Sequence, residues 1–265
     1  MRKILVLISI ICIFKVSAQD RVFTYTYQSG VLNKGQKEIE IWTTLATGRE
    51  NFYKSFMHRM EYEIGLGGNL QTSFYLNYGY SKAIVEENGI QSLNSDVQFS
   101  FSNEWKYKLS DPVADRIGSA LCLEYSLAPT ETAFKGKLIL DKQTGSFMHA
   151  FNLVGEYAIE KNFISDGTKL HDVNVGELNV ELSYGLSYRI KDNLSIGVEA
   201  FNQNQIAESI WKNSVLLLGP SISYKMDAFW VNLTFMPQIA NFKGNGLDLK
   251  DHERLQSRLI LSYAF

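Results

Sequence analysis

The sequence has little cysteine and no cysteine cluster. Its 265 residues contain two cysteines, Cys12 and Cys122, and Cys12 lies in an N-terminal apolar run that we expect to be removed. An exported chain with one remaining thiol has no disulfide framework and no zinc-type cysteine spacing. Glycine-rich phosphate loops and nucleophile elbows are missing as well. We therefore expect no disulfide, no metal site and no cofactor.

Runs of one charge sign and long hydrophobic runs are also absent. The net charge of −2 comes without a basic block or an acidic tail, so we expect no nucleic-acid partner. The mean hydropathy of −0.12 is too low for a helical membrane protein, although 45% of the residues are hydrophobic and 13% are aromatic. A β-barrel reconciles these values, because its strands alternate an apolar outer face with a polar inner face.

The N-terminus has the features of a secretory signal peptide. Met1-Arg2-Lys3 is basic, Ile4 to Phe14 is apolar, and Val16-Ser17-Ala18 ends in small residues. The apolar run of about eleven residues is too short to span a bilayer as a helix. We predict that residues 1–18 are a signal peptide, cleaved after Ala18, and that the chain is exported.

The stretch from Leu255 to Phe265 alternates between apolar and polar positions, as a strand with two unlike faces does. A barrel in a bilayer needs such a last strand to seal against its first, because no edge can face hydrocarbon. The stretch resembles the C-terminal strand of bacterial outer-membrane β-barrels. That resemblance implies that Tyr263 and Phe265 form a signal read by the outer-membrane assembly machinery, and that the protein resides in the cell outer membrane.

The same alternation recurs along the chain, most clearly from Glu177 to Ile190. Tight turns, such as Gly67-Gly68-Asn69 and Lys191-Asp192-Asn193, separate the alternating segments at one end. Longer polar segments separate them at the other, and we expect these to be loops: 81–94, 128–136, 161–175, 204–213 and 241–251. Short turns on one side and longer loops on the other are typical of outer-membrane barrels.

We therefore predict an all-β fold, a transmembrane antiparallel up-and-down β-barrel of about twelve strands, over residues 36–265. An even strand count places both ends of the barrel in the periplasm. Residues 19–35 also look extended. They form either a periplasmic stub or a segment inside the lumen.

The faces opposite the apolar stripes carry the charges. A basic group facing lipid near the midplane costs roughly 2–4 kcal/mol, so these faces must line the lumen. The densest charge cluster comes from the first two strands and the last, which we expect to place the two arginines of the last strand opposite the glutamates of the first. Its members are Glu38, Glu40, Arg59, Glu61, Glu63, Arg254 and Arg258.

Two interpretations of this cluster remain open. It forms either a polar conduit that tolerates cations, since carboxylates outnumber bases, or an internal salt-bridge network that fills a narrow barrel. Twelve strands lie between small barrels filled by side chains and open porins, so the strand count does not decide.

A barrel of this size is also compatible with a lipid-modifying enzyme similar to the outer-membrane phospholipase. That chemistry requires a histidine and a serine on the same outward face. His149 is predicted to project outward, but Ala150-Phe151-Asn152 supplies no serine beside it. We therefore expect no enzymatic activity and no catalytic residues.

Three short motifs add a family resemblance. The stretch Lys34 to Thr44, followed by Glu61 to Leu66 and then Asn69-Leu70-Gln71, looks like an outer-membrane β-barrel family labelled as transporters of the phenol-degradation pathway type. The label implies passage of small molecules, aromatic ones included, and fixes no catalytic residues.

Two functional hypotheses follow for a barrel whose partners are the lipid bilayer, the assembly machinery and small solutes. The first is a passive channel or transporter with a charged, Glu-rich lumen. The second is a plugged structural or interaction barrel that binds a partner through loops 81–94, 161–175 and 241–251.

Overall fold

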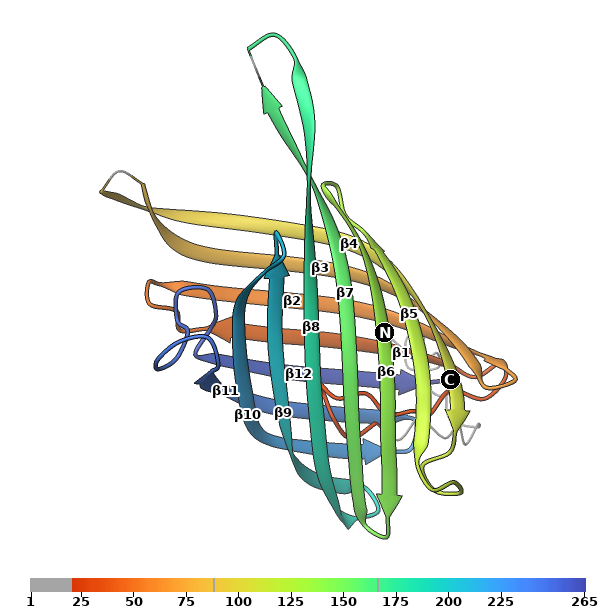
Figure 1. Ribbon diagram of the computed structural model, residues 1–265. Coiled ribbons are helices and arrows are strands. Elements are labelled where there is room, and N and C mark those ends of the chain that lie inside the picture. Colours follow the sequence, from red (N-terminus) through yellow and green to blue (C-terminus); the bar gives the residue numbers. More distant parts are fainter. Residues whose placement is uncertain (1–20, 88, 166) are drawn as a thin grey trace, which may run out of the picture.

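The computed structural model describes residues 21–87, 89–165 and 167–265, so the predicted signal peptide lies outside the described residues. These residues form a closed antiparallel barrel of twelve strands, in which each strand pairs with its sequence neighbours and β1 pairs with β12 (Figure 1). The predicted fold is confirmed. The strands are β1 (Lys37–Thr47), β2 (Tyr53–Gly67), β3 (Leu70–Glu87), β4 (Ile90–Ser110), β5 (Gly118–Leu127), β6 (Glu131–Thr144), β7 (Phe147–Ser165), β8 (Leu170–Lys191), β9 (Leu194–Ala207), β10 (Ile210–Met226), β11 (Phe229–Asn241) and β12 (Leu255–Ala264).

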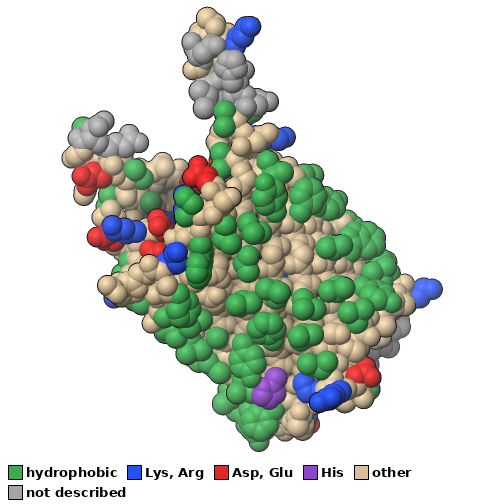
Figure 2. Space-filling model, in the orientation of Figure 1, with side chains coloured by type: hydrophobic (Ala, Val, Ile, Leu, Met, Phe, Trp, Pro, Cys, Tyr) green, Lys and Arg blue, Asp and Glu red, His purple; other side chains and the backbone are tan. Residues whose placement is uncertain are grey.

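Apolar side chains cover the outside of the barrel (Figure 2). The strand period decides which residues they are: on β5, Leu121 and Leu123 are 48% and 71% exposed, whereas Cys122 between them is 2% exposed. Water-soluble monomers rarely expose a continuous apolar surface of this kind, and lipid-embedded barrels require one. Within the described part of the chain, no helix is long and apolar enough to cross a membrane.

The barrel has two unlike ends. We call the end that carries the connections β2–β3, β4–β5, β6–β7, β8–β9 and β10–β11 the turn end, and the opposite end the loop end. The last strand closes the barrel at the turn end, where Lys37 N donates to Phe265 O at 3.1 Å and Phe265 N donates to Lys37 O at 2.9 Å. The terminal aromatic residue therefore completes the ladder between β12 and β1.

Several predicted loops at the loop end are wrong, because the strands continue through them. β3 and β4 extend to within two residues of each other across the predicted loop 81–94, and β7 and β8 occupy most of the predicted loop 161–175. Across 204–213, β9 and β10 are joined by Glu208 and Ser209, whose φ angles of 53° and 62° suit a two-residue hairpin turn.

The physical reason is that a hairpin rising above the bilayer meets water on both faces. Such a hairpin loses the apolar alternation by which strands are recognised in sequence. The hairpins β3–β4 and β7–β8 project well beyond the barrel (Figure 1). The predicted loop 241–251 is real, and residues 242–254 form what we call the β11–β12 loop.

Candidate functional site

Residues 21–35, which we call the plug, lie inside the barrel except for the exposed residues 33–35, which lead into β1. Phe23, Tyr25 and Leu32 are all buried, although the plug itself contains no strand. The plug starts near the turn end, bends over residues 24–26 and returns to β1 at the turn end. The wall side chains leave space in the interior of this twelve-stranded barrel, and the plug occupies it.

The bend of the plug is held by one carboxylate of the wall, that of Glu199 on β9. Three consecutive backbone N–H groups donate to it, from Thr24 at 2.9 Å, Tyr25 at 2.8 Å and Thr26 at 2.9 Å. The hydroxyl of Thr234 on β11 donates to the same carboxylate at 2.7 Å. Hydrogen bonds to an ionised acceptor are about twice as strong as neutral ones, so Glu199 is the main anchor of the plug.

Two further wall side chains bond the backbone of the plug. Asn152 on β7 accepts from Tyr27 N at 2.6 Å and donates to Tyr27 O at 2.9 Å. Asp141 on β6 accepts from Ser29 N at 2.9 Å and from the Ser29 hydroxyl at 2.6 Å. Buried backbone groups must find partners, and here polar side chains of the wall supply them.

The four glutamates predicted to cluster on the first two strands do so. Glu38 lies opposite Glu63 and Glu40 lies opposite Glu61 across the β1–β2 ladder, and all four are buried. Like charges directly opposite one another repel. The plug brings a cation to this wall, since the Arg21 guanidinium lies 3.4 Å from the Glu40 carboxylate.

Arg21 is a central residue of the site that the sequence did not reveal. Its side chain also donates to Phe23 O at 3.0 Å and Thr24 O at 3.1 Å, and its guanidinium lies 4.4 Å from the ring centroid of Trp42. It therefore fixes the fold of the plug and binds the plug to β1 at the same time. The only signal in the sequence was the excess of inward carboxylates over bases.

Glu38 and Arg59 face the lumen but do not pair with each other. Glu38 accepts from Trp230 Nε1 at 2.7 Å and from the Ser262 hydroxyl, so it joins β1 to both β11 and β12. Arg59 Nε donates to Asn77 Oδ1 at 2.8 Å, and its guanidinium lies 4.3 Å from the ring centroid of Tyr75. Glu38 and Arg59 were predicted to join a salt-bridge network, but uncharged side chains hold both of them instead.

The two arginines predicted to face the glutamates of β1 lie elsewhere. Arg258 pairs in register with Thr44 and donates to its hydroxyl at 2.9 Å. Its guanidinium lies 3.9 Å from the ring centroid of Tyr25, so it contacts the plug. Arg254 precedes β12 and its side chain is exposed. Residues of β12 that follow Arg258 pair with the glutamates of β1. The reason is that the C-terminal end of β12 closes the barrel and thereby sets the register between β12 and β1.

A second buried ion-pair group spans three strands. Lys137 on β6 lies 2.5 Å from the carboxylate of Glu104 on β4 and 3.1 Å from that of Glu124 on β5. Its ammonium also lies 4.5 Å from the ring centroid of Tyr27 in the plug. Both charged walls of the lumen therefore contact the plug directly.

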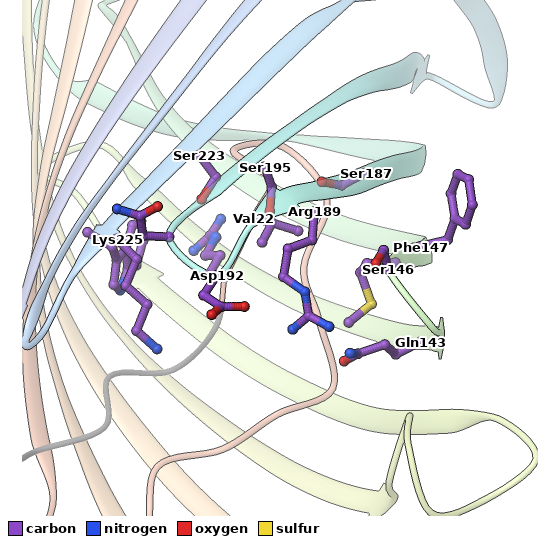
Figure 3. Close-up of a pocket in the computed structure, with 14 residues that line it drawn as sticks. Val22, Gln143, Ser146, Phe147, Ser187, Arg189, Asp192, Ser195, Ser223 and Lys225 are labelled. Carbon is purple, nitrogen blue, oxygen red and sulfur yellow. The ribbon is translucent and has the colours of Figure 1, made fainter.

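The turn end of the lumen holds a pocket of about 90 Å³ beside the start of the plug. Arg189, Asp192 and Lys225 reach into it near Val22, whereas Phe147 points away toward the outside (Figure 3). Two of these three charged groups are basic.

The loop end holds a larger cavity of about 420 Å³, which we call the vestibule. The inward residues of β9 show how it relates to the plug. Glu199 anchors the plug, Phe201 packs against Tyr25 in an apolar cluster with wall residues, and Gln203 lines the vestibule. The apolar cluster therefore separates the vestibule from the polar anchor of the plug.

His149, considered for a lipid-modifying enzyme, lies on β7. Its Nδ1 atom is 2.8 Å from the hydroxyl of Tyr184 on β8. The partner is thus a tyrosine and not a serine, so this histidine has no activated serine nucleophile beside it.

A closed barrel with an apolar outside and a charged, polar lumen is an outer-membrane β-barrel by architecture. The chain belongs to a family of unknown function (DUF6662), whose model matches residues 15–265. That family differs from the one its motifs resemble, while the broader resemblance to outer-membrane barrels holds. A comparison with the curated proteins found no match.

Three solved structures show the same fold. The chain is 10% identical to an outer membrane channel (COG4313) from Pseudomonas putida F1, covering 92% of this chain and 100% of that one, with a TM-score of 0.62. The translocator domain of the autotransporter NalP from Neisseria meningitidis is also 10% identical, covering 89% and 91%, with a TM-score of 0.58. The NanC porin is 10% identical, covering 85% and 98%, with a TM-score of 0.51. The likeness establishes the fold alone, since a channel, a porin and a translocator domain share it.

Proposed function

We propose that the protein is an outer-membrane channel for small solutes whose lumen is closed by the plug. One observation supports this most strongly: a separate chain segment, and not the wall, fills the centre of the lumen. Thr24, Tyr25, Thr26, Tyr27 and Ser29 reach the wall through hydrogen bonds to wall side chains. Such a segment can leave without breaking any ladder of the barrel.

The charges of the lumen bear on the solutes. Glu38, Glu40, Glu61 and Glu63 line one wall, and the cation beside Glu40 belongs to the plug. Withdrawal of the plug would leave this wall with an excess of carboxylates. A lumen of one charge sign concentrates solutes of the opposite sign, so the open channel would favour cationic and neutral solutes over anions.

Conductance across a planar lipid bilayer tests the proposal. The mature chain should conduct rarely, while Glu199→Ala and a variant lacking residues 21–32 should conduct frequently and pass cations in preference to anions. Glu177→Ala is the matched control, because this inward carboxylate bonds Asn179 and not the plug. Heat-modifiable gel migration verifies that each barrel is folded. Folded variants that stay as silent as the mature chain would refute the channel.

The alternative of a plugged interaction barrel is favoured by the projecting hairpins. At the start of β4, Ile90 and Leu93 are 72% and 59% exposed, beyond the barrel proper (Figure 1). Apolar side chains that remain exposed outside a bilayer favour contact with another protein. If no plug variant conducts, while removal of the β3–β4 hairpin tip abolishes capture of one defined partner from intact cells, the interaction barrel is the correct function.

We also propose that Tyr263 and Phe265 act as the assembly signal and that residues 1–18 direct export. The outward position of both rings, stacked with centroids 6.1 Å apart, leaves them accessible on the last strand. Deletion of Phe265 should lower the amount of folded barrel in the outer membrane. An unchanged amount would rule out this role.

A further inference from the structure

The vestibule has the size of a site for a small organic molecule. Its volume of about 420 Å³ lies within the usual range for ligand pockets, about 300–1,000 Å³. Strands β7 to β10 form one side, and the β11–β12 loop contributes Asp251 and His252. The lining is almost entirely polar, so any ligand must be recognised by hydrogen bonds and charge.

Three lining residues present polar atoms that no described residue satisfies. Asn213 is only 5% exposed, and its Nδ2 donates to Gln205 Oε1 at 2.6 Å, yet its Oδ1 has no hydrogen-bond partner within the described ranges. Gln203 Oε1 and His252 Nε2 likewise have no hydrogen-bond partner within the described ranges. An unsatisfied buried polar atom costs about 1–3 kcal/mol, so these atoms favour a ligand that pairs with them.

Several donors that line the vestibule are already engaged within the protein. Asn204 Nδ2 donates to Asn202 Oδ1 at 2.7 Å, and Arg49 donates to Glu253 at 2.5 Å. Asn179 Nδ2 donates to a glutamate at 2.9 Å. The unsatisfied amide atoms, in contrast, are both oxygens. The vestibule therefore offers acceptors to a ligand that supplies donors.

The unsatisfied imidazole nitrogen can also accept. Burial lowers the pKa of His252, although the carboxylates of Asp248 and Glu253 act to raise it, and the nearby Arg49 adds a smaller lowering effect. The ring is therefore neutral at pH 7, and a neutral imidazole has one nitrogen that accepts a hydrogen bond.

The charges of the vestibule point the same way. Glu156 is matched by Lys135 at 2.6 Å, and Arg49 is matched by Glu253. Glu181 and Asp251 line the vestibule and form no ion pair with any residue that the structure describes. Two carboxylates are thus left without a direct ion pair.

We infer that the vestibule binds a small organic amine in its protonated form. An ammonium group carries three donors and no acceptor, which matches free acceptors beside unpaired carboxylates. A neutral polyol carries no positive charge to match Glu181 and Asp251, and an anion would be repelled by them. The inference deepens the proposed function by naming the solute class, but the binding itself does not depend on conduction.

Isothermal titration calorimetry on the detergent-purified mature chain tests the inference, with 1,4-diaminobutane as the amine, sorbitol as the polyol and succinate as the anion. Diaminobutane alone should bind. Glu181→Gln and Asn213→Ala should each weaken its affinity by about tenfold or more. Glu208→Gln, a matched loss of charge at the exposed β9–β10 turn, should leave the affinity unchanged.

The outcomes are separable. Binding of sorbitol or succinate in preference to the diamine, no binding of any probe, or equal affinity in Glu181→Gln and Asn213→Ala with a folded barrel would overturn the amine site. Diamine binding together with a silent Glu199→Ala variant in the bilayer would leave the amine site intact and refute the channel. Conduction without diamine binding would refute the amine site and leave the channel intact.

Discussion

The two halves of the lumen differ in what occupies them. In the half that holds the plug, Glu199 is fully buried and receives hydrogen bonds from three consecutive backbone N–H groups of the chain itself. In the vestibule, Asn213 is 95% buried, and its Oδ1 has no partner in the described part of the protein. The wall follows the same strand alternation in both halves, and only the occupant differs.

This contrast teaches that closure and recognition are carried by different residues. The plug supplies donors to Glu199, Asn152 and Asp141, and these hydrogen bonds stabilise the closed half. The unpaired acceptors of the vestibule need a donor from a ligand. Changes at the plug should therefore alter closure of the lumen without altering ligand binding in the vestibule. Changes at the vestibule should alter ligand binding without altering closure.

The largest effect is expected for Glu199→Ala. The change leaves three buried N–H groups of the plug without an acceptor, at about 1–3 kcal/mol each, so docking of the plug should lose at least about 3 kcal/mol. Hydrogen exchange at the amides of Thr24, Tyr25 and Thr26 should accelerate by two orders of magnitude or more. Exchange at the amides of the β11–β12 loop should not change, and equal acceleration at both places would erase the distinction between the halves.

A somewhat smaller effect is expected for Tyr25→Ala. The ring packs against Phe201, Leu217 and Met236 and stacks on Arg258, and loss of a large buried side chain costs about 3 kcal/mol. Diffusion of solutes from the vestibule toward the plug should become measurable as a raised bilayer conductance. Tyr25→Phe is the control, since it loses only one hydroxyl contact, and a similar rise in that variant would contradict the role of the apolar cluster.

Gly65→Ala tests closure by steric means. A Cβ at Gly65 would lie 2.1 Å from the carbonyl oxygen of Asn33, whereas a Cβ at Gly155 would meet nothing within 4 Å. Overpacking typically costs about 1–3 kcal/mol, so the returning part of the plug should be displaced by the first change and unaffected by the second. Limited proteolysis of the plug checks this, and equal protection in both variants would show that the close approach has no consequence.

The smallest effect is expected from pH at the vestibule. Because the pKa of His252 lies below its ordinary value of 6.5 in the folded loop, mainly through burial, its contribution to packing is complete above that pH and is lost as the pH falls below it. The hydrogen-exchange protection factors of the β11–β12 loop, which are corrected for the intrinsic pH dependence of exchange, should fall modestly as the pH drops from 7.5 to 5.5. His252→Gln should remove part of that pH dependence. The neighbouring Arg49, Asp248, Asp251 and Glu253 are present in both proteins, so a pH profile unchanged by the substitution would contradict the role of His252.

Features that depend on the two-residue alternation of strands could be predicted from the sequence. The alternation of Leu259, Leu261 and Tyr263 with polar residues predicted the last strand, and the pairing of that strand with the first placed Glu38 and Glu40 at the seam. The polar tips of the hairpins were misread as loops, because strands in water on both faces lose alternation.

Contacts between the plug and the wall could not be predicted. Thr24 and Glu199 are 175 residues apart in the chain, and an irregular segment has no period that would indicate its partners. The same holds for Arg21, whose contact with Glu40 depends on where the plug enters the barrel.

The central claim is that the plug closes the lumen through Glu199, and one native thiol reports on it directly. Cys122 is free, buried and inward-facing, beside Ala120 and Ile139, with Tyr27 of the plug packed against that group. A charged methanethiosulfonate reagent reaches it only through an open lumen. Labelling in reconstituted vesicles should be slow in the mature chain and at least about tenfold faster in Glu199→Ala, which is about 1.4 kcal/mol in the opening equilibrium. Equal labelling rates in the two folded proteins would contradict the account.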